Sequence, residues 1–420
     1  MVKKGYKQTE IGVIPEDWEI KYLSDFGKIQ SGGTPSTTMA EYWGGNIAWC
    51  TPSDITSTPT KYINATERTI TDAGLKNSAA TVMPAGSILL CTRATIGELK
   101  INSIPMATNQ GFKNITINNS GNAEFFYYLL QTKKDCMLDL AIGSTFLEIS
   151  KTALIKIPLQ IPMHDEQSKI ADALSDIDNL VVVLEKQIAK KKAIKQGTMQ
   201  ELLTGKRRLP GFSGELETFV FGDLFDFIPN NAFTRAQLSD SGKVKNIHYG
   251  DILTKFGANI SADSNEIPYI EREIDLSRFA EKSYLQSGDI VIADTAEDDT
   301  VGKALEVINV ECPVLAGQHT LLCRPKANFA EKFLGYYLNA ACYHDQLLPF
   351  IVGTKVSSVS KASIAQTRLV VPKYEEQQAI SCILSDMDNE IKELEQKLEK
   401  YRQVKQGMMQ QLLTGKVRLV

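Results

Sequence analysis

Two stretches of the chain place hydrophobic residues at alternating spacings of four and three, which is the a/d pattern of a coiled-coil helix. The first seam consists of Ile170, Leu174, Ile177, Val181, Leu184 and Ile188. The second consists of Ile380, Leu384, Met387, Ile391, Leu394, Leu398 and Tyr401. No proline interrupts residues 163–209 or 373–420. The pattern therefore predicts two helices of about 40 residues, each roughly 60 Å long.

The two helical stretches are copies of each other. Residues 162–209 align without a gap onto 372–419, a shift of 210 residues, and 24 of the 48 aligned positions are identical. Similarity elsewhere between the two halves is faint. We therefore expect each half to be a diverged globular domain followed by a well-matched helical segment. The expected boundaries are 1–162, 163–209, 210–371 and 372–420.

Two matching seams are most simply used by burying one against the other, because a single seam cannot bury itself. This predicts an intramolecular antiparallel coiled coil. The two globular domains would then be inverted about a pseudo-two-fold axis and separated by the two long helices. An alternative is that each amphipathic helix packs on the core of its own domain. Gly197 and Gly407 are expected to mark a bend or a close approach of the two helices.

The globular domains mix short strand-like runs with amphipathic helices. Strands are predicted at 115–117 and 321–323, and helices at 124–138 and 329–348, in corresponding places of the two halves. The predicted fold class is therefore α+β, with two domains of mixed α/β character. All three tryptophans lie in the first domain, where we expect them to pack in the core and loops rather than to stack on bases.

Composition is that of an ordinary globular protein. Of the 420 residues, 43% are hydrophobic and 23% charged, which argues against disorder. The apolar runs are far shorter than the roughly 18 residues that a membrane span needs, and no secretory signal follows the basic start. The seven cysteines include no CxxC pair. We therefore expect a cytoplasmic protein with free thiols and no membrane partner. The net charge of −4 does not point to nucleic acid.

Motifs of catalytic chemistry are missing from the sequence. It contains no GxxxxGK[ST], GxGxxG, HExxH or GxSxG pattern, nor the (N/D)PP(Y/F) motif of amino-methyltransferases, and its four histidines lack ligand-like spacing. Glu98 and Lys100 have the ExK form seen in nucleases, but three-residue matches are common. The sequence thus predicts no catalytic site, cofactor or metal of its own.

A tandem of variable domain and repeated helix, without catalytic motifs, resembles the specificity subunit of Type I restriction–modification systems. The landmarks that carry the resemblance are, in order, YKQTEIG at 6–12, IPEDW at 14–18, GGTP at 32–35, YWGGNIAW at 42–49, TPSDI at 51–55, ATNQGF at 107–112, IP and EQ within 161–167, LLTGK at 202–206, AGQHT at 316–320, VP and EQ within 371–377, and LLTGK at 412–416. They span the whole chain. Ala48 stands where family members often have proline.

The resemblance implies a non-catalytic subunit that reads double-stranded DNA. Such a subunit recognises a split sequence, one half-site per target-recognition domain, across an unread spacer. Two methyltransferase subunits dock on it, and two ATP-dependent restriction/translocase subunits join them. S-adenosylmethionine, ATP and Mg²⁺ would belong to those partners, so no cofactor is expected in this chain.

The geometry predicted from the repeat agrees with this implication. Two inverted domains on a rigid spacer could meet successive major-groove faces about one helical turn apart, ~34 Å. Because the globular domains have diverged while the helices have not, the two half-sites should differ in sequence.

Candidate DNA-binding residues are chosen by side-chain chemistry and by position in loops. Base edges are read by Arg, Lys, Asn, Gln and small hydroxyl side chains, while phosphates are bound by cations and backbone N–H groups. In the first domain the candidates are Ser31, Gly32, Thr34, Arg93, Thr95, Asn109, Gln110, Lys113 and Thr145. In the second they are Lys245, His248, Tyr249, Gln318, His319, Lys355 and Ser358. Gln110 and Gln318 rank highest, because they occupy matched contexts in otherwise diverged domains.

A basic run in the first helix has two interpretations. Lys190, Lys191 and Lys192, with Lys195, could contact the phosphates of the DNA spacer, or they could form a solvated helix face. Positive charge recurs at the same level of the second helix, at 400–405.

Three other functions remain open from the sequence. The chain could be the recognition subunit of a different restriction system, whose partner fuses methyltransferase and nuclease activities. It could be a coiled-coil scaffold that binds proteins and no DNA. It could also be a nuclease that uses Glu98 and Lys100.

Overall fold

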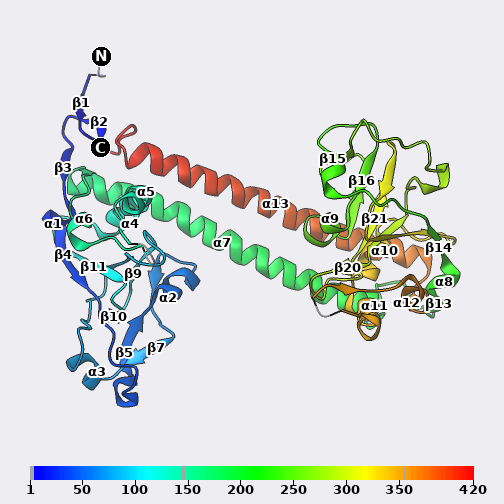
Figure 1. The fold of residues 1–420 in the computed structure, drawn as a ribbon, viewed down its shortest axis with the longest axis horizontal. Coiled ribbons are helices and arrows are strands. Elements are labelled where there is room, and N and C mark those ends of the chain that lie inside the picture. Colours follow the sequence, from blue (N-terminus) through cyan, green and yellow to red (C-terminus); the bar gives the residue numbers. More distant parts are fainter. Residues whose placement is uncertain (1–3, 144–146, 354) are drawn as a thin grey trace. The chain divides into compact units, whose positions relative to one another are not determined.

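The computed structural model describes residues 4–143, 147–353 and 355–420. The chain forms two compact units (Figure 1). Unit 1 consists of residues 1–186 and 396–420, and unit 2 of residues 187–395. The two long helices, α7 (His164–Leu203) and α13 (Tyr374–Leu412), each contribute residues to both units.

Unit 1 is built on a five-stranded sheet with the order β4-β11-β8-β9-β6. Its strands are β4 (Gly27–Ser31), β11 (Phe112–Ile117), β8 (Ile88–Cys91), β9 (Leu99–Asn102) and β6 (Tyr62–Ile63). Neighbours are antiparallel except β6 and β9, which are parallel. Every residue of β8 is buried, which explains its unbroken apolar run.

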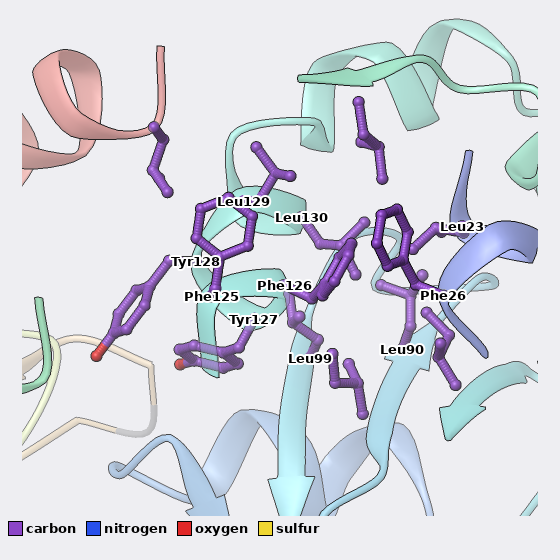
Figure 2. Close-up of a cluster of buried hydrophobic side chains, with 14 of the residues drawn as sticks. Leu23, Phe26, Leu90, Leu99, Phe125, Phe126, Tyr127, Tyr128, Leu129 and Leu130 are labelled. Atoms are coloured by element: carbon purple, nitrogen blue, oxygen red, sulfur yellow. The ribbon is translucent and has the colours of Figure 1, made fainter. Parts of the chain in front are cut away.

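The main core of unit 1 lies between this sheet and α4 (Ala123–Gln131) (Figure 2). Six consecutive side chains of α4, from Phe125 to Leu130, are buried. Phe126 packs against Phe26 with ring centroids 4.8 Å apart, in the same cluster as Leu90 and Leu99. Ile170 and Leu174 of the first seam also belong to this core. The middle of α4 is apolar on every face because neighbouring elements cover it on all sides.

A second, three-stranded sheet in unit 1 has the order β10-β5-β7. It consists of β10 (Met106–Thr108), β5 (Trp43–Cys50) and β7 (Arg68–Ile70), with β10 parallel and β7 antiparallel to β5. Short elements complete the unit: β1 (Tyr6–Thr9), β2 (Gly12–Pro15), β3 (Glu19–Lys21), α1 (Leu23–Phe26), η1 (Ala40–Tyr42), α2 (Pro52–Ser57), α3 (Asp72–Lys76), α5 (Lys134–Asp139), α6 (Lys151–Leu154) and β12 (Leu159–Ile161).

Unit 2 repeats this topology although its sequence has diverged. Its five-stranded sheet has the corresponding order: β14 (Phe225–Ile228), β23 (Thr320–Pro325), β19 (Ile290–Ala293), β21 (Ala304–Ile308) and β17 (Asn259–Ser261). Its second sheet is β15 (Leu238–Ser239), β18 (Tyr269–Ile270), β16 (Lys245–Ile247) and β22 (Val314–Ala316), with β22 parallel to β16 as β10 is to β5. The predicted mixed α/β character of both domains is confirmed.

The remaining elements of unit 2 are short. They are β13 (Glu217–Val220), α8 (Phe221–Leu224), η2 (Arg235–Gln237), α9 (Tyr249–Thr254), η3 (Glu281–Ser283), β20 (Thr295–Ala296), α10 (Phe333–Leu338), α11 (Ala341–His344), η4 (Leu348–Phe350), β24 (Ser357–Ser358), α12 (Lys361–Ala365) and β25 (Arg368–Val371). Within the described ranges of the chain, no helix is both long and apolar enough to cross a membrane.

The predicted helices at 124–138 and 329–348 are each divided in the structure. α4 ends at Gln131 and α5 begins at Lys134, while unit 2 has α10 and then α11. The division in unit 2 has a tertiary cause: the Asn339 side chain donates to the Ala304 carbonyl (2.6 Å) and accepts from the Ala304 N–H (3.0 Å). This amide ties the end of α10 to β21, where continuing the helix would break both bonds.

The long helices run antiparallel within each unit. In unit 1, Lys405 pairs with Asp178 (2.6 Å) and Arg402 with Glu185 (2.7 Å), so the numbering falls along one helix as it rises along the other. In unit 2, the ion pairs between Lys195 and Asp388 and between Lys192 and Glu395 show the same direction. The predicted antiparallel pairing is confirmed within both units.

The hydrophobic seams of the long helices pack in two places, on a globular domain and against the other long helix. Ile170 and Leu174 lie in the core of unit 1, and Ile380 and Leu384 lie in the core of unit 2. The start of each helix therefore packs on its own domain, as the alternative interpretation had it, while later residues face the other helix. The expected close approach at Gly197 and Gly407 is wrong, because a Cβ added at either glycine would meet nothing within 4 Å.

A buried ion pair recurs where each helix begins. Glu166 of α7 accepts from Arg418 (Nε to Oε1, 2.7 Å) and from the Trp18 indole N–H (3.0 Å). The equivalent Glu376 of α13 accepts from Arg208 Nε at 2.8 Å. Glu166 is 5% exposed. These carboxylates raise the pKa of both arginines.

The neighbouring glutamine also has the same role twice. The side-chain oxygen of Gln167 accepts from the Asn122 N–H (3.0 Å), and its amide donates to the Pro162 carbonyl (3.0 Å). Gln377 makes the corresponding bonds to the Ala330 N–H (3.1 Å) and the Pro372 carbonyl (2.8 Å). The glutamate and glutamine retained in both copies therefore join each helix to its globular domain.

A third repeated contact lies about three turns further along each helix. The hydroxyl of Tyr128 donates to Asp178 (2.7 Å), and that of Tyr336 donates to Asp388 (2.8 Å). The lysine of the opposite helix, Lys405 or Lys195, pairs with the same aspartate. Each aspartate thus links a globular domain to both long helices within its unit.

Unit 2 also contains a buried carboxylate that forms no ion pair within the described part of the chain. Glu306 of β21 is 2% exposed and accepts from the backbone N–H groups of Lys332 (2.6 Å) and Gly335 (2.8 Å). Burial raises the pKa of Glu306 to about 7, against the partial compensation of these two bonds. Between pH 4.5 and about 7, the folded state therefore holds a proton on Glu306 that the unfolded chain has released.

This proton predicts a pH-dependent stability. A raised folded pKa stabilises unit 2 fully below the unfolded value of 4.5, and this stabilisation is lost as pH rises to about 7. Glu306→Gln cannot titrate, so the stability of the variant relative to the natural chain should increase by roughly 2–3 kcal/mol between pH 5 and pH 8. Urea unfolding followed by circular dichroism measures this difference. A difference that does not change with pH would contradict the prediction.

Candidate nucleic-acid interface

Four of the candidates in unit 1 meet at the turn between β10 and β11. The Asn109 side chain accepts from the Gly111 N–H (2.9 Å), which fixes the turn. Thr34, after β4, donates its hydroxyl to the exposed Gln110 side chain. A Cβ on Gly32 would lie 2.1 Å from the Asn109 carbonyl oxygen, so this close approach requires glycine. We call Gly32, Thr34, Asn109 and Gln110 the unit 1 cluster.

The other candidates of unit 1 surround this cluster or turn away from it. Ser31 is exposed and pairs in register with Lys113. Lys113 is 7% exposed and lies 3.4 Å from the carboxylate of Glu148, so its charge is used within the fold. Arg93 forms a backbone bridge with Glu148, and the Thr95 N–H donates to the Arg93 carbonyl (2.8 Å). Thr145 lies outside the described residues.

Unit 2 has a corresponding turn between β22 and β23. His319 adopts a φ of +55°, a left-handed conformation that is uncommon outside glycine and is concentrated at functional sites. Its ring meets that of Tyr249 edge-on, with centroids 5.3 Å apart. Gln318 Nε2 lies 3.3 Å from His319 Nε2. Ser358 of β24 pairs with Thr295, whose hydroxyl is 3.5 Å from His319 Nδ1. We call Tyr249, Gln318, His319 and Ser358 the unit 2 cluster.

Two further candidates in unit 2 have structural roles. Lys245 is 3% exposed, and its ammonium donates to the carbonyls of Ala262 (2.8 Å) and Ser264 (3.0 Å). His248 is buried and caps α9 by accepting from the Gly250 N–H (3.1 Å). Burial lowers the pKa of His248, and the neighbouring Arg235 lowers it further. The ammonium of Lys245 and the capping ring nitrogen of His248 are therefore both used within the fold. Lys355 is exposed.

The two clusters occupy the same place in the shared topology. In unit 1 the N–H of Gly33 donates to the Thr108 carbonyl (2.9 Å), and in unit 2 Asn231 donates to Ala316 (3.0 Å). Gln110 and Gln318 are both the middle residue of the turn. Their flanking residues differ, with asparagine and glycine in unit 1 but glycine and histidine in unit 2. The same position therefore presents different donors and acceptors.

The comparison with known protein families agrees with the duplicated architecture. The family model for the Type I restriction modification DNA specificity domain matches residues 15–196 and again residues 214–402. The chain belongs to this family. Each match joins one globular domain to most of the long helix that follows it.

Individual members of the specificity family are similar over different lengths. The MjaIX specificity subunit of Methanocaldococcus jannaschii is 41% identical over 184 residues, which cover 43% of this chain and 43% of that protein. The MjaVIII specificity subunit of the same organism is 23% identical, with 99% of this chain and 97% of that protein covered.

Solved structures share the fold. The S subunit from M. genitalium has a TM-score of 0.57 at 14% identity, covering 94% of this chain and 96% of that chain. A chain from a study of complex assembly in the type I R-M system has a TM-score of 0.58 at 14% identity, covering 96% and 99%.

The lysine run of the first helix is largely exposed to solvent but forms ion pairs with the second helix. Lys191 pairs with Glu390 (2.5 Å), Lys192 with Glu395 (2.7 Å), and Lys195 with Asp388. Three of the four lysines are therefore neutralised within unit 2. The exposure of Lys190 and Lys192 agrees with a solvated helix face, to which the structure adds pairing with the second helix, while contact with spacer phosphates stays a prediction.

The ExK pair also has local partners. Glu98 pairs with Lys134 (2.6 Å), while Lys100 donates to the Thr60 carbonyl (2.6 Å). Burial lowers the pKa of Lys100. In the part of the chain that the structure describes, no group of three or more His, Cys, Asp and Glu side chains is arranged to hold a metal ion.

Two exposed arginines were not among the predicted residues. Arg68 of unit 1 lies over the Trp43 ring, and Arg278 of unit 2 lies near Phe279. No periodicity or motif links these pairs in the sequence. Arg68 meets Trp43 because β7 pairs with β5, and Phe279, although adjacent to Arg278 in the chain, packs on Phe233 through the fold, so neither ring assembly has a sequence signal.

Proposed function

We propose that this chain is the DNA-recognition subunit of a Type I restriction–modification complex and that each unit reads one half of a bipartite, asymmetric site. The observation that carries the proposal is the pair of turn clusters, which share one place in one topology and differ in side chains. Glutamine, asparagine and histidine side chains offer the donors and acceptors that distinguish base edges in the major groove. One recognition scaffold with two sets of readers suits two different half-sites.

The partners follow from the same proposal. The chain itself is non-catalytic and acts in the cytoplasm, where two methyltransferase subunits dock on it and two restriction/translocase subunits join. S-adenosylmethionine, ATP and Mg²⁺ are bound by those partners, and this chain holds no cofactor. The closely matched helical segments support two equivalent docking positions, because identical partners need similar surfaces on both halves.

Mapping methylated bases in the host genome, with and without this gene, tests the proposal. Deletion should abolish methylation at one bipartite motif whose two halves differ, and a plasmid copy of the gene should restore it. Methylation that is unchanged on deletion would overturn the proposal. Loss of a continuous or palindromic motif would refute the assignment of one half-site to each unit.

A further inference from the structure

An exposed arginine in unit 1 is held on an aromatic stack. The guanidinium carbon of Arg68 lies 3.7 Å from the ring centroid of Trp43 and 5.4 Å from that of Trp49. Trp49 is 4% exposed and meets Trp43 edge-on, with centroids 4.9 Å apart and an interplanar angle of 87°. A buried ring thus supports a half-buried ring, which in turn carries the cation.

The stack is fixed to the segment that carries the unit 1 cluster. The indole N–H of Trp49 donates to the Gly33 carbonyl (2.9 Å), and that of Trp43 donates to the Ser36 carbonyl (3.1 Å). Gly33 and Ser36 flank Thr34, which contacts Gln110. Arg68 itself lies on β7, directly opposite Trp49 of β5. Both rings are therefore positioned by the chain that bears two cluster residues.

The charge of Arg68 is not neutralised within the described part of unit 1, where no carboxylate lies within ion-pair distance of it. Several other arginines of the chain do have such partners. Arg324, for example, pairs with Asp289 (2.7 Å) and Arg402 with Glu185 (2.7 Å). A guanidinium that is stacked on a ring keeps its five N–H donors at its edge, where they remain open to a ligand.

Unit 2 contains the same device made from other residues. Arg278 lies 5.0 Å from the ring centroid of Phe279 and 5.5 Å from that of Phe233. Phe233 is 4% exposed and meets Phe279 nearly edge-on, at 5.8 Å and 69°. Phe233 follows Asn231, the counterpart of Gly33. A buried ring, a half-buried ring and an exposed arginine therefore recur, without sequence identity, beside both segments.

We infer that Arg68 and Arg278 are specificity-determining residues, and that each reads a guanine in the half-site of its own unit. Guanine presents two acceptors, O6 and N7, to the major groove, and a planar guanidinium can bind both at once. The close ring contact of Arg68 (3.7 Å) and the cation–π contacts of Arg278 (5.0 and 5.5 Å) restrict each guanidinium before DNA arrives, which reduces the entropy lost on binding. This inference rests on the proposed function, since it names two readers within it.

A phosphate contact is the competing role for an exposed arginine, and it has a different signature. A lost phosphate contact weakens binding to all sequences alike. It also reduces, by about one, the slope of the logarithm of the binding constant against the logarithm of the salt concentration. A lost base contact weakens binding to the cognate sequence alone. The two roles are therefore separated by measuring specificity together with affinity.

The test uses the complete complex with its methyltransferase partners. Arg68→Ala and Arg278→Ala are each expressed in the deletion host, and the methylated motif is mapped. Arg68→Ala should relax one guanine position in one half-site, and Arg278→Ala one guanine position in the other. In equilibrium binding, discrimination at that position should fall by about 10- to 100-fold. Trp43→Leu, which removes the ring but keeps the arginine, should reduce discrimination at the same position to a smaller extent.

Lys76→Ala and Arg272→Ala serve as matched controls, because each removes one exposed positive charge from the same unit without an aromatic contact. Both should leave the motif unchanged. Tryptophan fluorescence checks that unit 1 remains folded. An unchanged motif in both arginine variants overturns the inference, as does a uniform loss of affinity with lower salt dependence. If the natural complex methylates no bipartite motif, the proposed function itself fails.

Discussion

Replacing Arg418 by alanine should lower the free energy of unfolding of unit 1 by about 3 kcal/mol, the lower end of the range for breaking a buried ion pair. The reason is the carboxylate left behind. Glu166 is nearly inaccessible, and without Arg418 its charge keeps only the Trp18 N–H and the weaker Leu419 N–H (3.3 Å) as donors. The lower end applies because these bonds remain and because the arginine is itself partly exposed.

The measurement is urea unfolding followed by tryptophan fluorescence, since all three tryptophans belong to unit 1. Arg402→Ala is the matched control: it breaks an ion pair of the same length in the same unit, but both side chains are well exposed. That variant should cost less than about 1 kcal/mol. Adding Glu166→Gln to Arg418→Ala should restore part of the lost stability, because the buried charge is then removed.

Equal effects of Arg418→Ala and Arg402→Ala would show that the buried position of Glu166 is unimportant. A double variant that is no more stable than Arg418→Ala would place the cost in the other contacts of the arginine, its packing and its ion pair with Asp17 (2.7 Å), instead of the unpaired charge of Glu166.

Replacing residues 217–370 by the corresponding domain of another family member should change one half of the methylated motif completely and leave the other half as it was. The exchanged segment contains the unit 2 cluster and Arg278, whereas the unit 1 cluster is untouched. The incoming domain must supply a tyrosine at the position of Tyr336, which joins Asp388.

Mapping the methylated motif of the hybrid complex gives the result directly. A hybrid that carries phenylalanine at the position of Tyr336 is the informative control: it should recognise the same new half-site but methylate it less efficiently, because the domain is held less firmly. A change in both half-sites would contradict the assignment of one half-site to each unit.

The sequence predicted best what depends on periodicity and repetition. The a/d spacing identified both long helices, and the similar contexts of ATNQGF and AGQHT matched Gln110 with Gln318, which the structure places at the middle of equivalent turns. What it missed depends on tertiary contacts. The bonds of Asn339 to β21 interrupt a helix whose local pattern is continuous. The sequence also gives no sign that the ammonium of Lys245, a candidate DNA ligand, donates to two carbonyls within the fold.

The contacts that join Gln167 and Gln377 to the globular domains have a consequence for how new specificities arise. On the domain side, each glutamine bonds a backbone N–H, of Asn122 or Ala330, which almost any residue supplies. This part of the joint contacts main chain, so the tyrosine that meets the aspartate of the helix is the specific side chain that an exchanged domain has to supply. If each domain reads one half-site, as proposed, recombination within the gene would replace one domain and its half-site while the long helices stay unchanged. The two long helices would then be the constant part of the protein, and the globular domains that they hold would be the variable part.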